Sequence, residues 1–123
     1  MEKFFDIAGT DIDPAEDENA EDTPWKVKYT GKARKQKDKL PEQMKKALFL
    51  LKLELEQEGP EQTEWPHYGK LKGKKKGEEF YHCHLSHSKQ SYVAIWKVTD
   101  FELQLMEIRY VGTHENADYR RIS

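Results

Sequence analysis

A strictly alternating segment, Phe80-Tyr81-His82-Cys83-His84-Leu85-Ser86, lies in the last third of this chain. Successive side chains of a β-strand point to opposite faces of the sheet, so one face would carry Tyr81, Cys83 and Leu85. The opposite face would carry His82, His84 and Ser86. The pattern predicts a half-buried strand with imidazoles on its open side.

Two further strands are predicted after this segment, over Tyr92–Thr99 and Glu102–Val111, and His114 follows just past Gly112. Both strands are apolar on both faces in their middle, which is typical of central strands covered on one side by helices. The expected faces set Val93 and Ile95 against Ala94, Trp96 and Val98, and Leu103 and Leu105 against Met106, Ile108 and Tyr110. His82, His84, Lys97 and Arg109 meet on the uncovered face only if the strand registers cooperate, and the sequence leaves those registers open.

The first half of the domain predicts one strand and two helices. Trp25–Thr30 alternates apolar and basic residues, as a half-buried strand does, and Gly31–Lys39 reads as a short, strongly basic helix. Pro41 is expected to be the first residue of a second helix, Glu42–Glu58, which Gly59-Pro60 ends. Its apolar residues recur at helical spacing: Met44, Ala47, Leu48, Leu51 and Leu55. The order predicts a two-layer α+β domain, with the strand and helix pair packed on an antiparallel sheet that ends in a three-strand meander.

Length and composition exclude several classes of protein. The chain has 123 residues, enough for one small domain. No apolar run approaches the roughly 18 residues that a membrane span needs, and Met1–Thr10 has no signal-peptide pattern, so we expect a soluble cytoplasmic protein without membrane partners. Cys83 is the only cysteine, which excludes an intrachain disulfide and predicts a buried thiol.

The net charge of −2 conceals an uneven distribution. Residues 1–24 hold nine acidic side chains against Lys3, whereas residues 25–123 carry a net charge of +6 before any histidine is protonated. We therefore expect an acidic, mostly disordered extension over residues 1–24 and a basic folded domain over 25–123. The extension either aids solubility or folds back over the basic face, with Phe4, Phe5 and Ile7 as a docking point.

Lysine and glycine dominate the stretch from Trp65 to Gly77, which we interpret as a cationic loop rather than a strand. Such a run is usually a solvated surface, but its aromatic residues could stack on unpaired bases while its lysines contact phosphates. The candidate RNA-binding residues, here and on the strands, are His67, Lys70, Lys74, Lys75, Lys76, His82 and Lys97.

The combined pattern resembles a known family of bacterial proteins. It comprises the strand and helix pair and then Leu71-Lys72-Gly73, Tyr81–Leu85, Tyr92–Val98, Val111-Gly112-Thr113-His114 and a terminal aromatic residue. Together they are similar to the RelE/ParE superfamily of toxins from type II toxin–antitoxin systems, and most similar to its YafQ-like branch. The resemblance extends from Trp25 to Tyr119.

This resemblance implies a ribosome-dependent endoribonuclease that cuts messenger RNA, needs no metal or other cofactor, and is held inactive by a cognate antitoxin. His84 and His114 match the catalytic histidines of the branch, and Tyr119 stands near the place of its terminal aromatic. Cleavage through the 2′-hydroxyl needs a base, an acid and positive charge on the phosphorane oxygens. The imidazoles would be base and acid in either order, and Lys72 and Arg109 would supply the charge.

Other functions stay open at this stage. A ParE-like toxin with the same fold would bind DNA gyrase without cutting RNA, and a decayed toxin would retain only antitoxin or nucleic-acid binding. His82, His84, His87 and His114 offer enough nitrogen atoms for a zinc site, although alternate residues of a strand splay apart and no second cysteine is present. An antitoxin would place an amphipathic segment on the Glu42–Glu58 helix or on the sheet edge.

Overall fold

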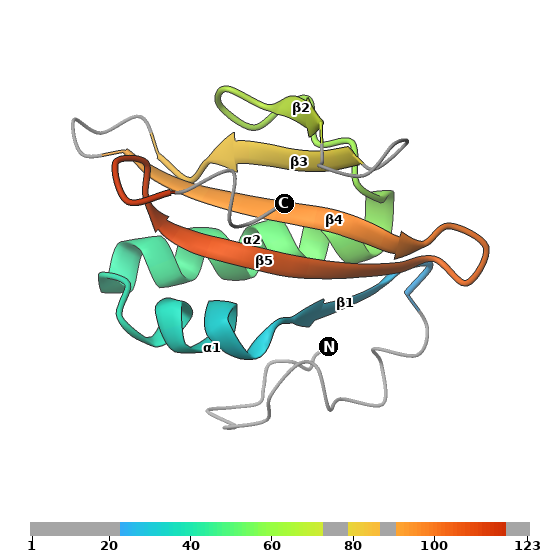
Figure 1. Ribbon diagram of the computed structural model, residues 1–123, viewed down its shortest axis with the longest axis horizontal. Helices are drawn as coiled ribbons and strands as arrows, with labels where there is room; N and C mark the ends of the chain where they lie inside the picture. The colour runs from blue at the N-terminus through green and yellow to red at the C-terminus, as the bar shows by residue number, and fades with distance from the viewer. Residues whose placement is uncertain (1–22, 73–78, 87–90, 118–123) are drawn as a thin grey trace, which may run out of the picture.

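The computed structural model of the protein describes residues 23–72, 79–86 and 91–117. The predicted disordered extension therefore lies almost wholly outside the described residues. Within them the chain forms two helices and five strands (Figure 1). In chain order these are β1 (Lys26–Tyr29), α1 (Gly31–Asp38), α2 (Glu42–Glu58), β2 (Gly69–Lys72), β3 (Glu79–His84), β4 (Tyr92–Asp100) and β5 (Leu105–Thr113).

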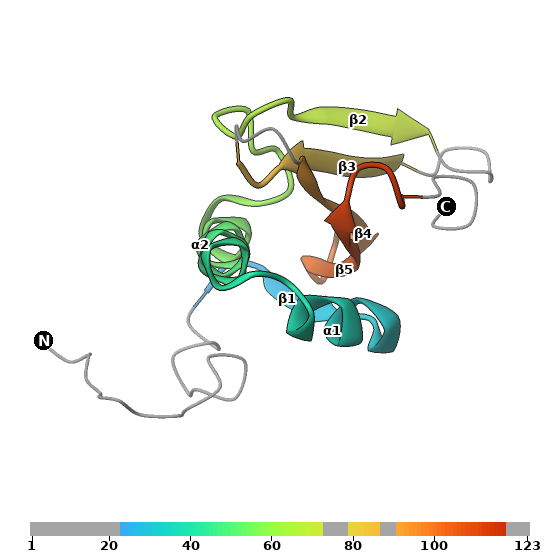
Figure 2. The same ribbon diagram turned by 90° about the vertical axis from the view of Figure 1, so that its left-hand side faces the viewer.

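The strands form one sheet in the order β1-β5-β4-β3-β2. α2 covers one face of this sheet and α1 lies along its β1–β5 edge (Figure 2). Residues of both helices pack into the same core, so the domain has the α+β composition that the sequence predicts. The sheet is mixed rather than antiparallel, because β1 pairs in parallel with β5, in register from Lys26 with Leu105 to Tyr29 with Ile108. The meander of β3, β4 and β5 is antiparallel, as expected.

The prediction of a loop at Gly69–Lys72 was wrong, because these residues form the edge strand β2. β2 pairs antiparallel with β3, from Gly69 with His82 to Lys72 with Glu79. Lysine and glycine have low strand propensity, but pairing with an available neighbour overrides local preference, and lysines are common on edge strands. A Cβ atom at Gly69 would lie 3.1 Å from Nε2 of His82, so this close approach favours glycine.

The last strand begins later than predicted. Phe101–Gln104 form a turn, in which Oδ1 of Asp100 accepts a hydrogen bond of 2.9 Å from the amide of Leu103. Leu103 consequently lies in this turn, 67% exposed, and not in the strand that was predicted to begin at Glu102. The aspartate offers the backbone a local partner, which competes with strand pairing in a way that an apolar pattern does not reveal.

A β-bulge at Arg109 changes the faces of β5. Ile95 pairs with Tyr110 whereas Trp96 pairs with Ile108, so Arg109 is the additional residue. Ile108 belongs to the core under the helices, and Tyr110 belongs to a separate apolar cluster. The expectation that these two residues share a face was therefore wrong, since one extra residue reverses the alternation.

The predicted helices are confirmed with small shifts at their ends. Thr30 caps α1 through its Oγ1 atom, which accepts a hydrogen bond of 3.1 Å from the amide of Ala33. Pro41 is the N-cap of α2 and not its first residue. Gly59 ends α2 at a φ of 95°, where a Cβ atom would meet Nε1 of Trp25 at 3.0 Å.

The main core lies between the helices and the sheet. Trp96 is fully buried there, with its ring centroid 6.1 Å from that of Tyr81. Cys83 is buried in the same cluster, as expected, and this burial raises the pKa of its thiol to about 12. A smaller cluster on the opposite side of the sheet contains Phe80, Val93, Ile95 and Tyr110. Neither described helix has the length and apolar character needed to cross a membrane.

Candidate functional site

The candidate site lies on the distal face, which we define as the side of the sheet opposite α2. Alternation along β3 puts His82 and His84 on this face with Phe80, because Tyr81 and Cys83 belong to the core under the helices. Lys97 and Arg109 also reach this face, since both lie over the ring of Phe80. The predicted polar residues of the three central strands therefore share one face.

Three imidazoles from distant parts of the chain meet at one end of this face. The ring centroid of His84 lies 5.5 Å from that of His114 and 4.3 Å from that of His67. We call these three residues the histidine cluster. The family resemblance pairs His84 and His114 as candidate catalytic residues, and in the structure their rings are adjacent.

Backbone hydrogen bonds hold the histidine cluster in place. The amide of His84 donates to the carbonyl of Pro66 at 2.8 Å, which ties the segment before β2 to the end of β3. The amide of His114 donates to the carbonyl of Ser91, also at 2.8 Å, which ties the end of β5 to the start of β4. The second contact continues the β4–β5 pairing by one residue, and the first joins the turn at Pro66 to the last residue of β3. The backbone of both histidines is therefore held by the sheet.

His67 occupies an uncommon backbone conformation, with a φ of 55°. Residues other than glycine rarely adopt this left-handed region, although histidine tolerates it better than most. Such strain concentrates at functional sites, where the surrounding structure maintains it. The sequence suggested only an RNA contact for His67, and no periodic pattern could reveal that a turn carries this ring to His84.

His82 differs from its neighbours because its ring packs beside Gly69, its partner on β2. Its Nδ1 atom is buried and has no hydrogen-bond partner among the described residues. Burial lowers the pKa of His82 below its usual value, and the positive charges that His114 and His67 carry when protonated lower it further. These surroundings favour a neutral structural histidine over the RNA contact that the sequence suggested.

The lowered pKa of His82 predicts an acid-sensitive fold. The unfolded state binds the proton at a higher pH than the folded state, so the free energy of unfolding should fall as the pH drops below about 6.5. In His82→Gln this contribution is absent, and we expect a smaller loss of stability between pH 7 and pH 5. Urea unfolding at both pH values measures the difference, with Thr99→Ala as control. An equal loss in wild type and His82→Gln would contradict the prediction.

Lys97 and Arg109 form a second group away from the histidine cluster. Lys97 Nζ lies 5.3 Å from the Phe80 ring centroid, and Arg109 Nη1 forms an ion pair of 2.6 Å with Glu107. Phe80 precedes His84 by four strand residues, which corresponds to roughly 13 Å. The structure therefore does not bring Arg109 to the two histidines whose chemistry it was expected to assist.

The lysines of β2 are also separated from the histidine cluster. Lys70 lies on the helix side of the sheet, where its Nζ is 5.9 Å from the Tyr81 ring centroid and 3.4 Å from a carboxylate oxygen of Glu61. The hydrogen bond to Glu61 raises the pKa of Lys70. The Cα atom of Lys72 pairs with Glu79, five residues or roughly 17 Å before His84.

Four predicted site residues cannot be compared with this geometry: Lys74, Lys75, Lys76 and Tyr119 lie outside the described residues. Within the parts of the chain that the structure describes, no group of three or more His, Cys, Asp or Glu side chains has a geometry that could hold a metal ion. What the histidine cluster offers is two or three imidazoles close enough to act on one small group. Comparison with protein-family models, curated proteins and solved structures found no match to this chain.

Proposed function

We propose that this protein is an endoribonuclease whose histidine cluster cleaves RNA by acid–base catalysis. The observation that supports the proposal is the separation of 5.5 Å between the ring centroids of His84 and His114. A phosphodiester placed between two such rings could exchange protons with one imidazole at its 2′-hydroxyl and with the other at its 5′-oxygen. Imidazole suits both tasks, because its ordinary pKa is near neutrality.

The reaction proceeds by attack of the 2′-oxygen on the adjacent phosphorus atom. One histidine, which we assign as His84, removes the 2′-hydroxyl proton as the new P–O bond forms. His114 donates a proton to the departing 5′-oxygen as the old bond breaks, and the reverse assignment satisfies the same balance. The products are a 2′,3′-cyclic phosphate and a 5′-hydroxyl, and no metal takes part.

The phosphorane carries additional negative charge, which the site must stabilise. Arg109 is too far along the sheet for this role, and the backbone of Lys72 pairs with Glu79 at the opposite end of β3 from His84. His67 stands 4.3 Å from His84 between ring centroids and supplies positive charge when it is protonated. In this proposal Lys97 and Arg109 contact the RNA backbone away from the scissile bond, where charge contributes to affinity without regard to sequence.

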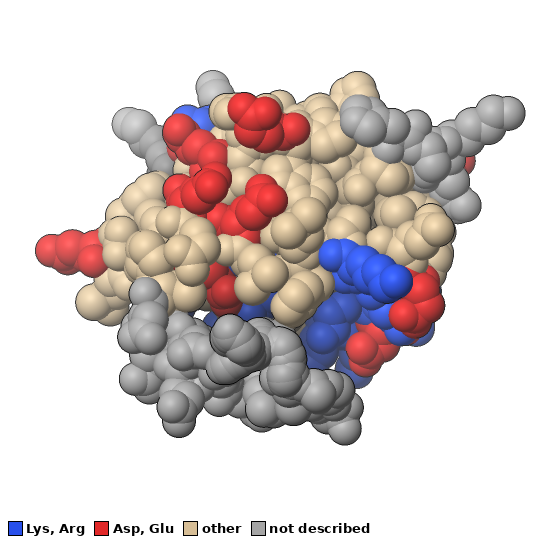
Figure 3. All heavy atoms as spheres, turned by 180° about the vertical axis from the view of Figure 1, so that it is seen from behind, with Lys and Arg blue, Asp and Glu red and all other residues tan. Residues whose placement is uncertain are grey.

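The biological role that we propose is that of a toxin in a type II toxin–antitoxin system, which cuts messenger RNA on the ribosome and so inhibits translation. The resemblance of the sequence to the RelE/ParE superfamily supports this role. The antitoxin would cover the exposed apolar residues Phe49, Leu50 and Leu53 on α2. Seen from behind, acidic side chains gather at the upper left of the molecule, and Lys and Arg gather at the lower right, where acidic side chains border them (Figure 3). A partner could match this uneven distribution of charge.

The proposal is tested with ribosomes programmed with a defined message. We expect purified protein to cut the message in the decoding site and to leave a 2′,3′-cyclic phosphate. A message with one 2′-deoxynucleotide at the mapped cleavage position should resist cutting there, because its attacking oxygen is absent. Cutting of the deoxy-substituted position would refute the 2′-hydroxyl mechanism. If folded protein cuts neither ribosome-bound nor free RNA, the nuclease proposal fails, and inhibition of DNA gyrase supercoiling becomes the next assay.

A further inference from the structure

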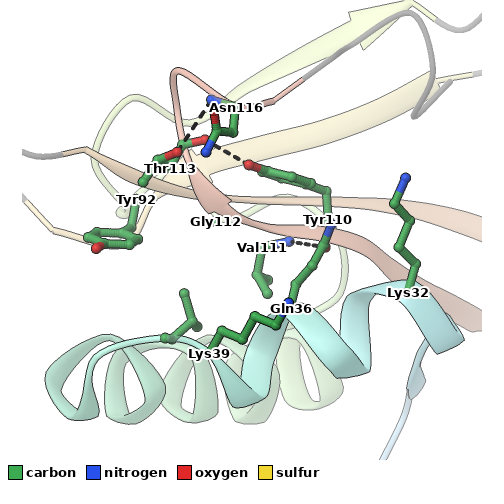
Figure 4. Close-up of a pocket in the computed structure, with 10 residues that line it drawn as sticks. Lys32, Gln36, Lys39, Tyr92, Tyr110, Val111, Gly112, Thr113 and Asn116 are labelled. Carbon is green, nitrogen blue, oxygen red and sulfur yellow. Dashed lines mark hydrogen bonds between the residues drawn. The ribbon is translucent and has the colours of Figure 1, made fainter.

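A cavity of about 410 Å³ lies between α1 and the end of β5 (Figure 4). We call it the edge pocket. Lys32, Gln36 and Lys39 approach it from α1 and its C-terminal cap, and Tyr110 and Asn116 from β5 and the following turn. Tyr92, at the start of β4, completes the wall. Its volume falls in the range of small-ligand sites, about 300–1,000 Å³.

The edge pocket exists because β1 is shorter than β5. The parallel pairing ends where Tyr29 lies opposite Ile108, whereas β5 continues to Thr113. Over part of this remaining edge α1 takes the place of a strand, and Oε1 of Gln36 accepts a hydrogen bond of 3.2 Å from the amide of Val111. Since the oxygen of Gln36 is used in this bond, the NH2 group of the same side chain can donate to a ligand.

One wall of the edge pocket is fixed before any ligand binds. The hydroxyl of Tyr110 donates a hydrogen bond of 2.8 Å to the carbonyl of Thr113, which holds the ring across Gly112. A Cβ atom at Gly112 would lie 2.7 Å from that hydroxyl, so a larger residue would displace the ring. A preformed wall reduces the entropy that a ligand must lose on binding.

The chemistry of the edge pocket indicates an anionic, planar ligand. Lys32 and Lys39 are exposed, and none of the described residues that line the pocket is acidic. The partly exposed Tyr92 offers an aromatic surface at the end of the pocket opposite Lys32 (Figure 4). Ammonium groups on the α1 wall and an aromatic ring at one end of the same pocket match a phosphate joined to a base.

We propose that the edge pocket binds one nucleotide of the RNA strand that the histidine cluster cleaves. The ammonium groups of Lys32 and Lys39 hold its phosphate, and its base lies against Tyr92. The inference rests on the proposed function for RNA as the ligand. The position of the pocket supports the proposal, because Thr113 and Asn116, which lie on either side of His114 in the chain, line it. An RNA strand bound between His84 and His114 would therefore reach the pocket next.

The test measures binding separately from cleavage. A fluorescein-labelled 2′-O-methyl RNA hexamer of mixed sequence has no free 2′-hydroxyl to attack, so anisotropy reports affinity alone. We expect Lys32→Gln/Lys39→Gln to weaken binding about 10-fold or more, and Tyr92→Leu about 5-fold or more. The matched control is Lys35→Gln/Lys46→Gln, which removes the same charge from exposed helix residues that do not line the pocket. Its affinity should change less than about 3-fold.

Each outcome separates this inference from the proposed function. Equal losses in the two double variants, with Tyr92→Leu unchanged, would show that only overall charge matters and would overturn the pocket. If the pocket variants weaken hexamer binding as expected but wild type cuts no RNA, the nucleotide site stands and the nuclease fails. If RNA is cut but the pocket variants bind and cut like the control, the nuclease stands and the pocket fails. Circular dichroism checks that Tyr92→Leu is folded before its affinity is interpreted.

Discussion

Alanine in place of either His84 or His114 is expected to lower kcat/KM for RNA cleavage about 10²-fold or more. Each substitution removes one proton-transfer group from a pair whose ring centroids lie 5.5 Å apart. His114 is exposed and His84 is partly exposed, so neither change should unfold the protein. Mapping of cleaved ends on programmed ribosomes over a range of protein concentrations gives the rate for each variant.

The double variant His84→Ala/His114→Ala distinguishes a catalytic pair from two independent contacts. Groups that act as a unit show losses that are far from additive, so the double variant should be little slower than the slower single variant. Added imidazole should restore part of the activity of a single variant, which a merely structural role would not allow. Thr99→Ala is the control, because Thr99 is an exposed residue of β4, and this variant should cut at the wild-type rate. Full additivity without imidazole rescue would reject the pair.

Much of the fold follows from local patterns in the sequence. The strict alternation over residues 80–86 and the helical spacing over residues 42–58 each record a surface with one buried side, and the structure confirms both elements. The position of β2 depends instead on an available edge of β3, which composition does not encode. The turn at Phe101–Gln104 depends on one side-chain hydrogen bond, and the bulge depends on one extra residue, Arg109. Hydrophobic periodicity is averaged over many residues, so it does not reveal either feature.

Only the part of the candidate site that depends on which face of a strand a residue occupies could be predicted from the sequence. Alternation along β3 predicts the face on which His84 lies, and the position of His114 after Gly112 puts it at a strand end. The register that brings the two rings together is left open by the sequence. His67 reaches them only through a left-handed turn and a backbone hydrogen bond to His84, which are tertiary features. The strand register explains why Arg109 shares the distal face yet lies far from the pair, and register follows from the whole sheet rather than from one strand.

The edge pocket also could not be predicted from the sequence, because it depends on a contact between distant segments. The sequence marks α1 as basic but gives no reason to connect it with β5. The connection arises because β1 stops at Tyr29 and leaves the amide of Val111 to Gln36, which is 75 residues away in the chain. A surface that looked like an ordinary solvated helix thereby becomes one wall of a cavity next to His114.

Trp96→Ala is expected to lower the free energy of unfolding by about 3–5 kcal/mol. The side chain is fully buried between the sheet and the helices, and its Nε1 atom donates a hydrogen bond of 3.1 Å to the carbonyl of Pro60. Alanine would leave a large cavity beside Tyr81 and Tyr68 and an unpaired buried carbonyl. Domains of this size have about 5–15 kcal/mol in total, so the loss is a large fraction of the stability.

Urea unfolding at pH 7 measures this loss, and Leu103→Ala is the matched control. Leu103 is 67% exposed in the turn before β5, so its truncation should change the free energy of unfolding by less than about 0.5 kcal/mol. Trp96→Phe retains an aromatic ring but not the hydrogen bond, and should fall between the two. Because Trp96 lies on the helix side of the sheet and the histidine cluster on the distal face, folded Trp96→Phe should still cleave RNA at the wild-type rate. Equal effects of Trp96→Ala and Leu103→Ala would mean that the core does not centre on this tryptophan.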